Sequence, residues 1–169
     1  MTANIKPCVL VTGGAGYIGS HAVLALRDAG WPVAVIDNLT TGFRFAIPEG
    51  VPLYEGDIED ADLLARIFAE QGTRAIMHFA GSIVVPESVA DPLKYYHNNT
   101  AKTRALIAAG AIGQVDHVDT AFSYDNRAEP GNIRNRPETG GGGIRDIGVY
   151  TYGSARFVTG AEATDLSCR

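Results

Sequence analysis

Four glycines near the amino terminus carry the strongest chemical signal in the sequence. They lie in the segment Gly13-Gly14-Ala15-Gly16-Tyr17-Ile18-Gly19, between an apolar run and a stretch with helical periodicity. Glycines at such a turn let backbone N–H groups approach a phosphate without a Cβ in the way, and the start of a helix adds partial positive charge. Glycine turns after strands are common, so the segment alone is equally compatible with an ordinary tight turn.

A carboxylate follows at the spacing expected for a dinucleotide site. Asp37 lies eighteen residues after Gly19, at the end of the next apolar run. A carboxylate there can accept hydrogen bonds from an adenosine ribose and disfavours a 2′-phosphate. The combination predicts NAD as cofactor, in preference to NADP. A P-loop is excluded because no Lys-Ser or Lys-Thr follows the last glycine.

Two further segments could complete such a site. Asp57 follows a third apolar run and could accept a hydrogen bond from an adenine amino group, although a solvated acid leading into a helix is the alternative. Phe79, Ala80 and Gly81 end a fourth run, where small residues would let a cofactor lie across the edge of a sheet. Ordinary sheet packing is the alternative for this segment.

A parallel sheet is needed to position these residues, and the sequence predicts one. Short β-branched runs alternate with helical periodicity up to about residue 118, which is typical of βαβ units in a doubly wound, Rossmann-type α/β fold with right-handed crossovers. Gly30, Gly72 and Gly110 are placed to end helices. Strands are expected over residues 8–12, 33–37, 51–55 and 75–80, and helices over 17–29, 60–72 and 92–109.

Composition and charge bear on the partners of the chain. Its 169 residues are 46% hydrophobic and carry a net charge of −5, which argues against a nucleic-acid or anionic-membrane surface, since both need a basic patch. No apolar run approaches the roughly 18 residues of a membrane span. The two cysteines, Cys8 and Cys168, lack metal-ligand spacing, so no metal site is expected, and we predict reduced thiols in a cytoplasmic protein.

The sequence changes character after residue 118. Between Asp119 and Asp146 there is no Leu, Val or Met, and residues 140–143 are four consecutive glycines. We predict that this stretch is a mobile loop, because it lacks the apolar residues that would offset its ordering entropy. The expected organisation is an NAD-binding domain over residues 1–118 and a divergent, largely irregular tail over 119–169, without a complete substrate domain.

Over about residues 6–117 the chain resembles the extended short-chain dehydrogenase/reductase family, and within it the UDP-glucose 4-epimerases. The matching segments include Asp37-Asn38-Leu39, Gly56-Asp57-Ile58, His78-Phe79-Ala80-Gly81 and Tyr95-Tyr96-His97-Asn98-Asn99-Thr100, in addition to the glycine segment. The resemblance implies an NAD cofactor, a UDP-sugar substrate and pairing into a homodimer. It places Gly13, Gly16, Tyr17, Ile18 and Gly19 at the pyrophosphate, Asp37 and Asn38 at the adenosine ribose, Asp57 and Ile58 at the adenine, and Phe79, Ala80, Gly81 and Asn99 at the nicotinamide half.

The resemblance also implies a reaction, the inversion of C4 of a UDP-hexose by oxidation and reduction with NAD. In the family a tyrosine of a Tyr-x-x-x-Lys helix removes the hydroxyl proton, and a serine precedes that helix. The nearest counterparts here are Ser123, Tyr152 and Arg156, with arginine in the place of lysine, and no tyrosine of the chain has a lysine four residues later. A planar guanidinium does not replace a compact ammonium. A solvated loop pair is the alternative interpretation of Tyr152 and Arg156.

Three hypotheses for the function follow. The first is an NAD-dependent UDP-glucose 4-epimerase, or a truncated copy of one. The second is a non-catalytic NAD-binding remnant whose tail arose by a frameshift or rearrangement. The third is a sugar-nucleotide dehydratase or decarboxylase, which would share the same cofactor segments. We expect a chain that retains the cofactor site and has little or no epimerase activity of its own.

Overall fold

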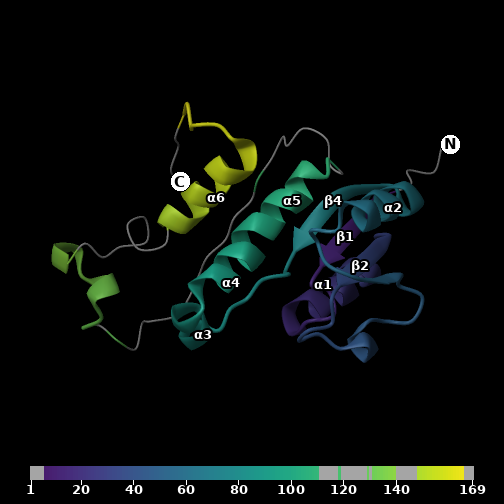
Figure 1. The fold of residues 1–169 in the computed structure, drawn as a ribbon, viewed down its shortest axis with the longest axis horizontal. Coiled ribbons are helices and arrows are strands. Elements are labelled where there is room, and N and C mark those ends of the chain that lie inside the picture. The colour runs from purple at the N-terminus through teal and green to yellow at the C-terminus, as the bar shows by residue number, and fades with distance from the viewer. Residues whose placement is uncertain (1–5, 111–117, 119–128, 130, 140–147, 166–169) are drawn as a thin grey trace. The chain divides into compact units, whose positions relative to one another are not determined.

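The computed structural model describes residues 6–110, 118, 129, 131–139 and 148–165 (Figure 1). The chain divides into two compact units, Met1–Gln114 and Val115–Arg169. In the described residues of the first unit, four parallel strands form one sheet in the order β3-β2-β1-β4. The predicted doubly wound α/β fold is therefore confirmed in this unit.

Burial explains the order of the strands. β1 (Cys8–Thr12) and β2 (Val33–Asp37) are buried at every residue and lie in the middle of the sheet. β3 (Leu53–Glu55) and β4 (Thr73–His78) flank them and are partly exposed. Successive side chains of a strand point to opposite faces, so β1 and β2 contribute to two apolar clusters. One cluster contains Leu10, Ile36, Leu64, Ile67 and Leu106, and the other contains Val9, Val11, Val23, Val33 and Val35.

Helices cover both faces of the sheet, and local signals set their ends. α1 (Tyr17–Asp28) supplies Val23 to the second cluster, and the chain leaves it through Gly30 at φ +70°. α2 (Ala61–Gln71) packs on the other face; Asp60 caps it by accepting a hydrogen bond from the N–H of Leu63 at 3.0 Å. Gly72, at φ +61°, ends α2 in the left-handed conformation. These ends confirm the predicted helix boundaries to within a residue.

The region after β4 differs from the predicted single helix over residues 92–109. Helix begins earlier, in α3 (Val85–Ala90), and is interrupted at Asp91, whose carboxylate accepts from the N–H of Lys94 at 3.1 Å. The interruption follows from Pro92, which disfavours helical backbone at the residue before it. The chain continues through α4 (Pro92–Tyr96), a π-helical turn over His97–Ala101 and α5 (Lys102–Ala108).

β4 also differs from its prediction, because it begins and ends two residues earlier than residues 75–80. Thr12 pairs with His78 at the end of the β1–β4 ladder. Phe79, Ala80 and Gly81 therefore form a loop after the strand, although their apolar character had suggested its end. β3 is shorter than predicted and begins after Pro52.

In the described residues of the second unit, the main element is α6 (Val149–Thr159), which ends at Gly160 with φ +64°. The sequence predicted a largely irregular tail and did not predict this helix. Tyr152 and Arg156 lie on it, so their interpretation as a loop pair is wrong. Two short 3-10 turns, Ile133–Asn135 and Pro137–Thr139, precede it. The predicted loop over 119–146 falls mostly outside the described residues. Among the helices that the structure describes, none is long and apolar enough to cross a membrane.

Candidate nucleotide-binding site

The glycine turn between β1 and α1 is packed so closely that side chains are excluded. Gly13 has φ +68°, and a Cβ added there would lie 2.6 Å from the nitrogen of Ala80 and 2.7 Å from the carbonyl carbon of Phe79. A Cβ on Gly19 would lie 2.2 Å from the carbonyl oxygen of Gly13. The turn is thus held between the first turn of α1 and the loop after β4, and its outer surface is bare backbone.

The amino terminus of α1 opens at this turn. Gly16 is the residue before the helix, and no side chain of the described residues caps the first turn. Tyr17 and Ile18 are 83% and 63% exposed, so solvent reaches this end of the helix. The N–H groups of a first helical turn have no partner within the helix and carry partial positive charge. An open helix start beside a cradle that a Cβ would fill fits a pyrophosphate.

Asp37 joins the glycine turn to the end of β2. Its side chain is buried, with Oδ2 accepting from the N–H of Ala15 at 2.9 Å and Oδ1 from the N–H of Leu39 at 2.8 Å. Each carboxylate oxygen can accept a second hydrogen bond, so a ribose hydroxyl remains a compatible partner. The sequence indicated a ligand-binding role for Asp37 but not this structural one.

A loop after β2 folds back on the same turn. The N–H of Phe43 donates to the carbonyl of Ala15 at 3.0 Å, so Ala15 is held through both of its backbone groups. A Cβ on Gly42 would lie 2.8 Å from the Cβ of Ala15, which makes glycine necessary at this approach. Sequence analysis missed Gly42. Its only signal was a glycine in a Thr-Thr-Gly run shortly after Asp37.

Asp57 lies in a network of charges rather than free in solvent. Its Oδ2 accepts from Lys102 Nζ at 2.5 Å and from Asn38 Nδ2 at 3.2 Å, and its Oδ1 accepts from the N–H of Glu59 at 3.3 Å. Burial raises the pKa of Asp57, but the hydrogen bonds from Lys102 and Asn38 outweigh it and hold the pKa below its ordinary value. Ile58 is buried in the first apolar cluster, so only its backbone could meet an adenine.

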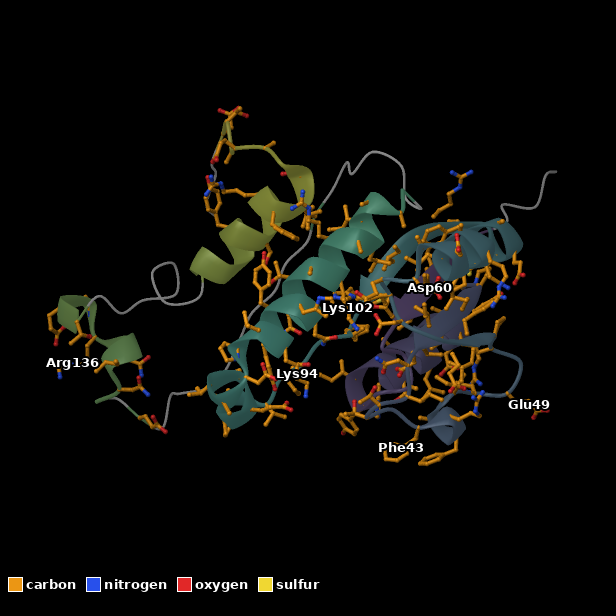
Figure 2. All side chains as sticks on the ribbon, in the orientation of Figure 1. Phe43, Glu49, Asp60, Lys94, Lys102 and Arg136 are labelled. Atoms are coloured by element: carbon orange, nitrogen blue, oxygen red, sulfur yellow. The ribbon has the colours of Figure 1, made fainter. Side chains whose placement is uncertain are left out.

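Lys102, labelled in Figure 2, was not predicted to belong to the site. Its side chain is only 13% exposed, and Nζ also lies 3.5 Å from a carboxylate oxygen of Glu59. The residue comes from α5, forty-five positions after Asp57. No local pattern in the sequence could reveal such a distant partner.

The loop after β4 is held by the two consecutive asparagines of the π-helical turn. Asn99 Oδ1 accepts from the N–H of Ser82 at 2.7 Å, and Asn99 Nδ2 donates to the carbonyl of Ser82 at 2.8 Å. Asn98 Nδ2 donates to Ser82 Oγ at 2.9 Å. The N–H of Gly81 donates to the carbonyl of Phe79 at 3.0 Å. The fold therefore brings Asn99 beside the Phe79-Ala80-Gly81 segment.

His78 connects the end of the sheet to this same region. Thr103 Oγ1 donates to the carbonyl of Asn99 at 2.9 Å, so it accepts from the Nε2–H of His78 at 3.1 Å. Burial lowers the pKa of His78 from its ordinary value, which favours the neutral imidazole. In that neutral form Nδ1 accepts from the hydroxyl of the buried Thr12 at 2.7 Å.

The candidate catalytic residues lie in the second unit. Tyr152 and Arg156 share one face of α6, with the guanidinium 5.7 Å from the centre of the tyrosine ring. Arg156 forms an ion pair with Glu162, and the Tyr152 hydroxyl lies 3.4 Å from the same carboxylate. The positive charge of Arg156 is thus directed to Glu162. Ser123 lies outside the described residues.

Three features define the class of this protein: the parallel sheet, the closely packed glycine turn at an open helix start, and the carboxylate after β2. Together they are those of a dinucleotide-binding α/β protein of the doubly wound class. A family model described as the NAD dependent epimerase/dehydratase family matches residues 9–135, and the chain belongs to that family.

Named relatives refine this assignment. The chain is 58% identical over 154 residues to a UDP-glucose 4-epimerase of Azospirillum brasilense, which covers 91% of the chain and 43% of that protein. A Thermus thermophilus UDP-glucose 4-epimerase solved with NAD matches with a TM-score of 0.59 and 42% identity, over 61% of this chain and 33% of that one. A Thermotoga maritima UDP-glucose 4-epimerase solved with UDP-glucose gives 0.58 and 35% identity, over 61% and 33%.

The resemblance to the family extends further along the chain than the sequence predicted. It was expected to stop near residue 117, but the family match runs to residue 135 and the Azospirillum alignment includes 154 of the 169 residues. The chain spans less than half the length of each of these relatives.

Proposed function

We propose that this chain carries the NAD-binding part of a UDP-glucose 4-epimerase. The observation that carries the proposal is the glycine turn, whose closely packed backbone meets an open helix start next to a buried carboxylate. The relatives named above are UDP-glucose 4-epimerases, and one of their structures contains NAD. The family also includes dehydratases, but the names of these relatives favour the epimerase hypothesis.

The residues present fit an NAD molecule in an extended form. The turn and first helical N–H groups would hold the pyrophosphate, and the carboxylates after β2 and β3 would meet the adenosine. NAD, when bound, would supply the reversible oxidation at C4 of the sugar. The residues proposed for these contacts are Gly13, Gly16, Tyr17, Ile18, Gly19, Asp37, Asn38, Asp57, Ile58, Phe79, Ala80, Gly81 and Asn99.

NAD is proposed in preference to NADP. Asp37 is buried and its two oxygens are fixed by backbone N–H groups, so the carboxylate cannot easily turn away from a 2′-phosphate. Isothermal titration of the purified chain with each cofactor tests this directly. We expect NAD to bind at least tenfold more tightly than NADP. Equal affinities would overturn the assignment of Asp37 to the ribose.

The chain itself is proposed to turn over little or no UDP-galactose. The proposed base, Tyr152, has Arg156 four residues later, and Arg156 is engaged by Glu162, which places a negative charge beside the hydroxyl. Proton removal by tyrosine would use a positive neighbour instead. The role of Ser123 remains a prediction from the resemblance.

A coupled assay for UDP-glucose formed from UDP-galactose tests the catalytic part of the proposal. We expect turnover far below the roughly 10 per second of ordinary enzymes. Arg156→Lys is the matched variant, because it restores a compact ammonium at the same position. If the unaltered chain converted UDP-galactose at an ordinary rate, the low-activity proposal would be refuted and Tyr152 with Arg156 would be a genuine catalytic pair.

A homodimer and a cytoplasmic location complete the proposal. Val85 and Val89 of α3 and Leu93 and Tyr96 of α4 are each more than 60% exposed, which supports burial against a second copy. Sedimentation analysis of the whole chain would test this, and a monomer at high micromolar concentration would contradict it. The free thiol of Cys8 is consistent with a reducing compartment.

A further inference from the structure

Lys102 is a charged side chain beside the carboxylate proposed to meet the adenine, and the proposed function gives it no role. It comes from α5, and only 13% of its side chain is exposed. Its Nζ lies 2.5 Å from Asp57 Oδ2 and 3.5 Å from a carboxylate oxygen of Glu59. Burial lowers the pKa of Lys102, but the hydrogen bond and the negative charge of Asp57 outweigh burial and raise it. The side chain is therefore an ammonium group.

The ammonium group has a hydrogen-bond donor to spare. It carries three N–H donors, and its partners among the residues that the structure describes are the two carboxylates of Asp57 and Glu59. A donor that is largely shielded from water costs free energy until an acceptor reaches it. A ligand that brings an acceptor to Nζ would therefore gain a charge-assisted hydrogen bond.

Asp57 presents an acceptor next to this donor. Its Oδ2 accepts from both Lys102 and Asn38, whereas its Oδ1 accepts only from the N–H of Glu59, at 3.3 Å, among the described residues. A carboxylate oxygen can accept two hydrogen bonds, so Oδ1 retains one acceptor position. The Asp57 side chain is 27% exposed, which leaves the carboxylate open to a ligand. Asp57 and Lys102 thus offer an acceptor and a donor side by side.

The edge of a purine can use such a pair in two ways. In adenine the 6-amino group donates and N1 accepts; in a 6-oxo purine such as hypoxanthine, N1 carries a hydrogen and donates, while the 6-oxygen accepts. Adenine has a second donor for its N1, the backbone N–H of Ile58. The 6-oxygen of hypoxanthine needs a donor beside Asp57, because a carboxylate facing it alone would set acceptor against acceptor. The ammonium of Lys102 is such a donor.

We propose that Lys102 is a specificity-determining residue for the base: paired with Asp57, it lets the site accept a dinucleotide with a 6-oxo purine as readily as NAD. The inference rests on the proposed function, because it presumes that the base of a dinucleotide lies against Asp57. It widens the class of ligand, since a carboxylate without the ammonium would select the 6-amino purine. The contact joins α5 to the segment after β3, so the fold itself brings donor and acceptor together.

The test compares two dinucleotides whose bases differ at position 6 of the purine. Affinities for NAD and for nicotinamide hypoxanthine dinucleotide are measured by isothermal titration on the full chain and on Lys102→Met. We expect the parent to bind the two ligands with dissociation constants that agree within about threefold. Lys102→Met should bind the hypoxanthine dinucleotide about tenfold more weakly than NAD, as the loss of one charge-assisted hydrogen bond predicts. Both ligands meet the same protein sample, so the ratio of affinities does not depend on how much of a variant is folded.

Lys94→Met is the matched control, because it removes an ammonium group from α4 that is paired with Glu87 and 52% exposed, and it should keep the parent's ratio. Both lysines are labelled in Figure 2.

A parent that prefers NAD by more than threefold would overturn the inference, and this result needs no variant to fold. A ratio in Lys102→Met that equals the parent's would also overturn it, and an equal loss of both affinities would assign Lys102 a structural role. Absence of binding of either dinucleotide to the folded parent chain would instead overturn the proposed function, and the inference with it.

Discussion

Replacing Asp37 should destabilise the first unit before any cofactor is considered. Its carboxylate accepts from the N–H of Ala15, which is buried, and from the N–H of Leu39, which is half-buried. Asp37→Ala leaves both donors without their partner. A buried donor left unsatisfied costs about 1–3 kcal/mol, and the half-buried one, which water can reach, costs the lower end of that range. The expected loss is about 2–4 kcal/mol of unfolding free energy, a large fraction of the roughly 5–15 kcal/mol of a typical domain.

Urea denaturation of the parent and three variants measures this loss. Asp37→Asn retains one acceptor oxygen and sets an NH2 group against the other donor, so its loss should be smaller than that of Asp37→Ala. Asp28→Ala is the surface control, since the Asp28 side chain is 71% exposed and the ion pair that it forms with Arg27 at 3.4 Å is weak. It should lie within about 0.5 kcal/mol of the parent. If Asp37→Ala unfolded as late as Asp28→Ala, water would be satisfying both N–H groups and the argument from their burial would fail.

Three other perturbations test separate parts of the fold. Gly19→Ala should lower the free energy of unfolding, measured in urea, by about 1–3 kcal/mol, because the added Cβ would lie 2.2 Å from the carbonyl oxygen of Gly13. Gly153→Ala is the matched control in α6, where a Cβ would meet nothing within 4 Å, and it should be neutral or stabilising. Burial lowers the pKa of His78, so on acidification its imidazole is protonated at a higher pH in the unfolded chain than in the folded one. The free energy of unfolding should therefore fall as the pH drops below about 6.5, and His78→Asn should make it less dependent on pH. A double-mutant cycle of Lys102→Met with Asp57→Asn should give a coupling of about 1–3 kcal/mol in the free energy of unfolding. A coupling near zero would show that the pair contributes no more to stability than a solvent-exposed ion pair does.

Features that depend on neighbouring residues could be predicted from the sequence. Asp60 and Gly72 were expected at the two ends of a helix, and both signals act within one helical turn. The glycine turn was equally predictable, because a strand, the turn and a helix follow one another directly. The parallel sheet followed from the alternation of such units.

Features that depend on distant contacts could not be predicted. Lys102 reaches Asp57, and Asn99 reaches Ser82, across long stretches of chain. The shift of β4 has the same origin, since its end is set by the ladder with β1 and not by the apolar character of the residues that follow. α6 forms in a segment whose apolar residues have no clear period, so only the three-dimensional structure reveals it.

The position of Cys8 makes the centre of the sheet directly observable by thiol chemistry. Its side chain is 4% exposed in β1, between β2 and β4, and burial raises the pKa of the thiol despite a backbone hydrogen bond that lowers it. Alkylating reagents react with the thiolate, so labelling must wait until the strand opens to solvent. In a Cys168→Ser background Cys8 is the single thiol of the chain. The rate at which Cys8 is alkylated then reports how often β1 opens to solvent. A ligand bound at the adjoining glycine turn should lower this rate in proportion to its occupancy.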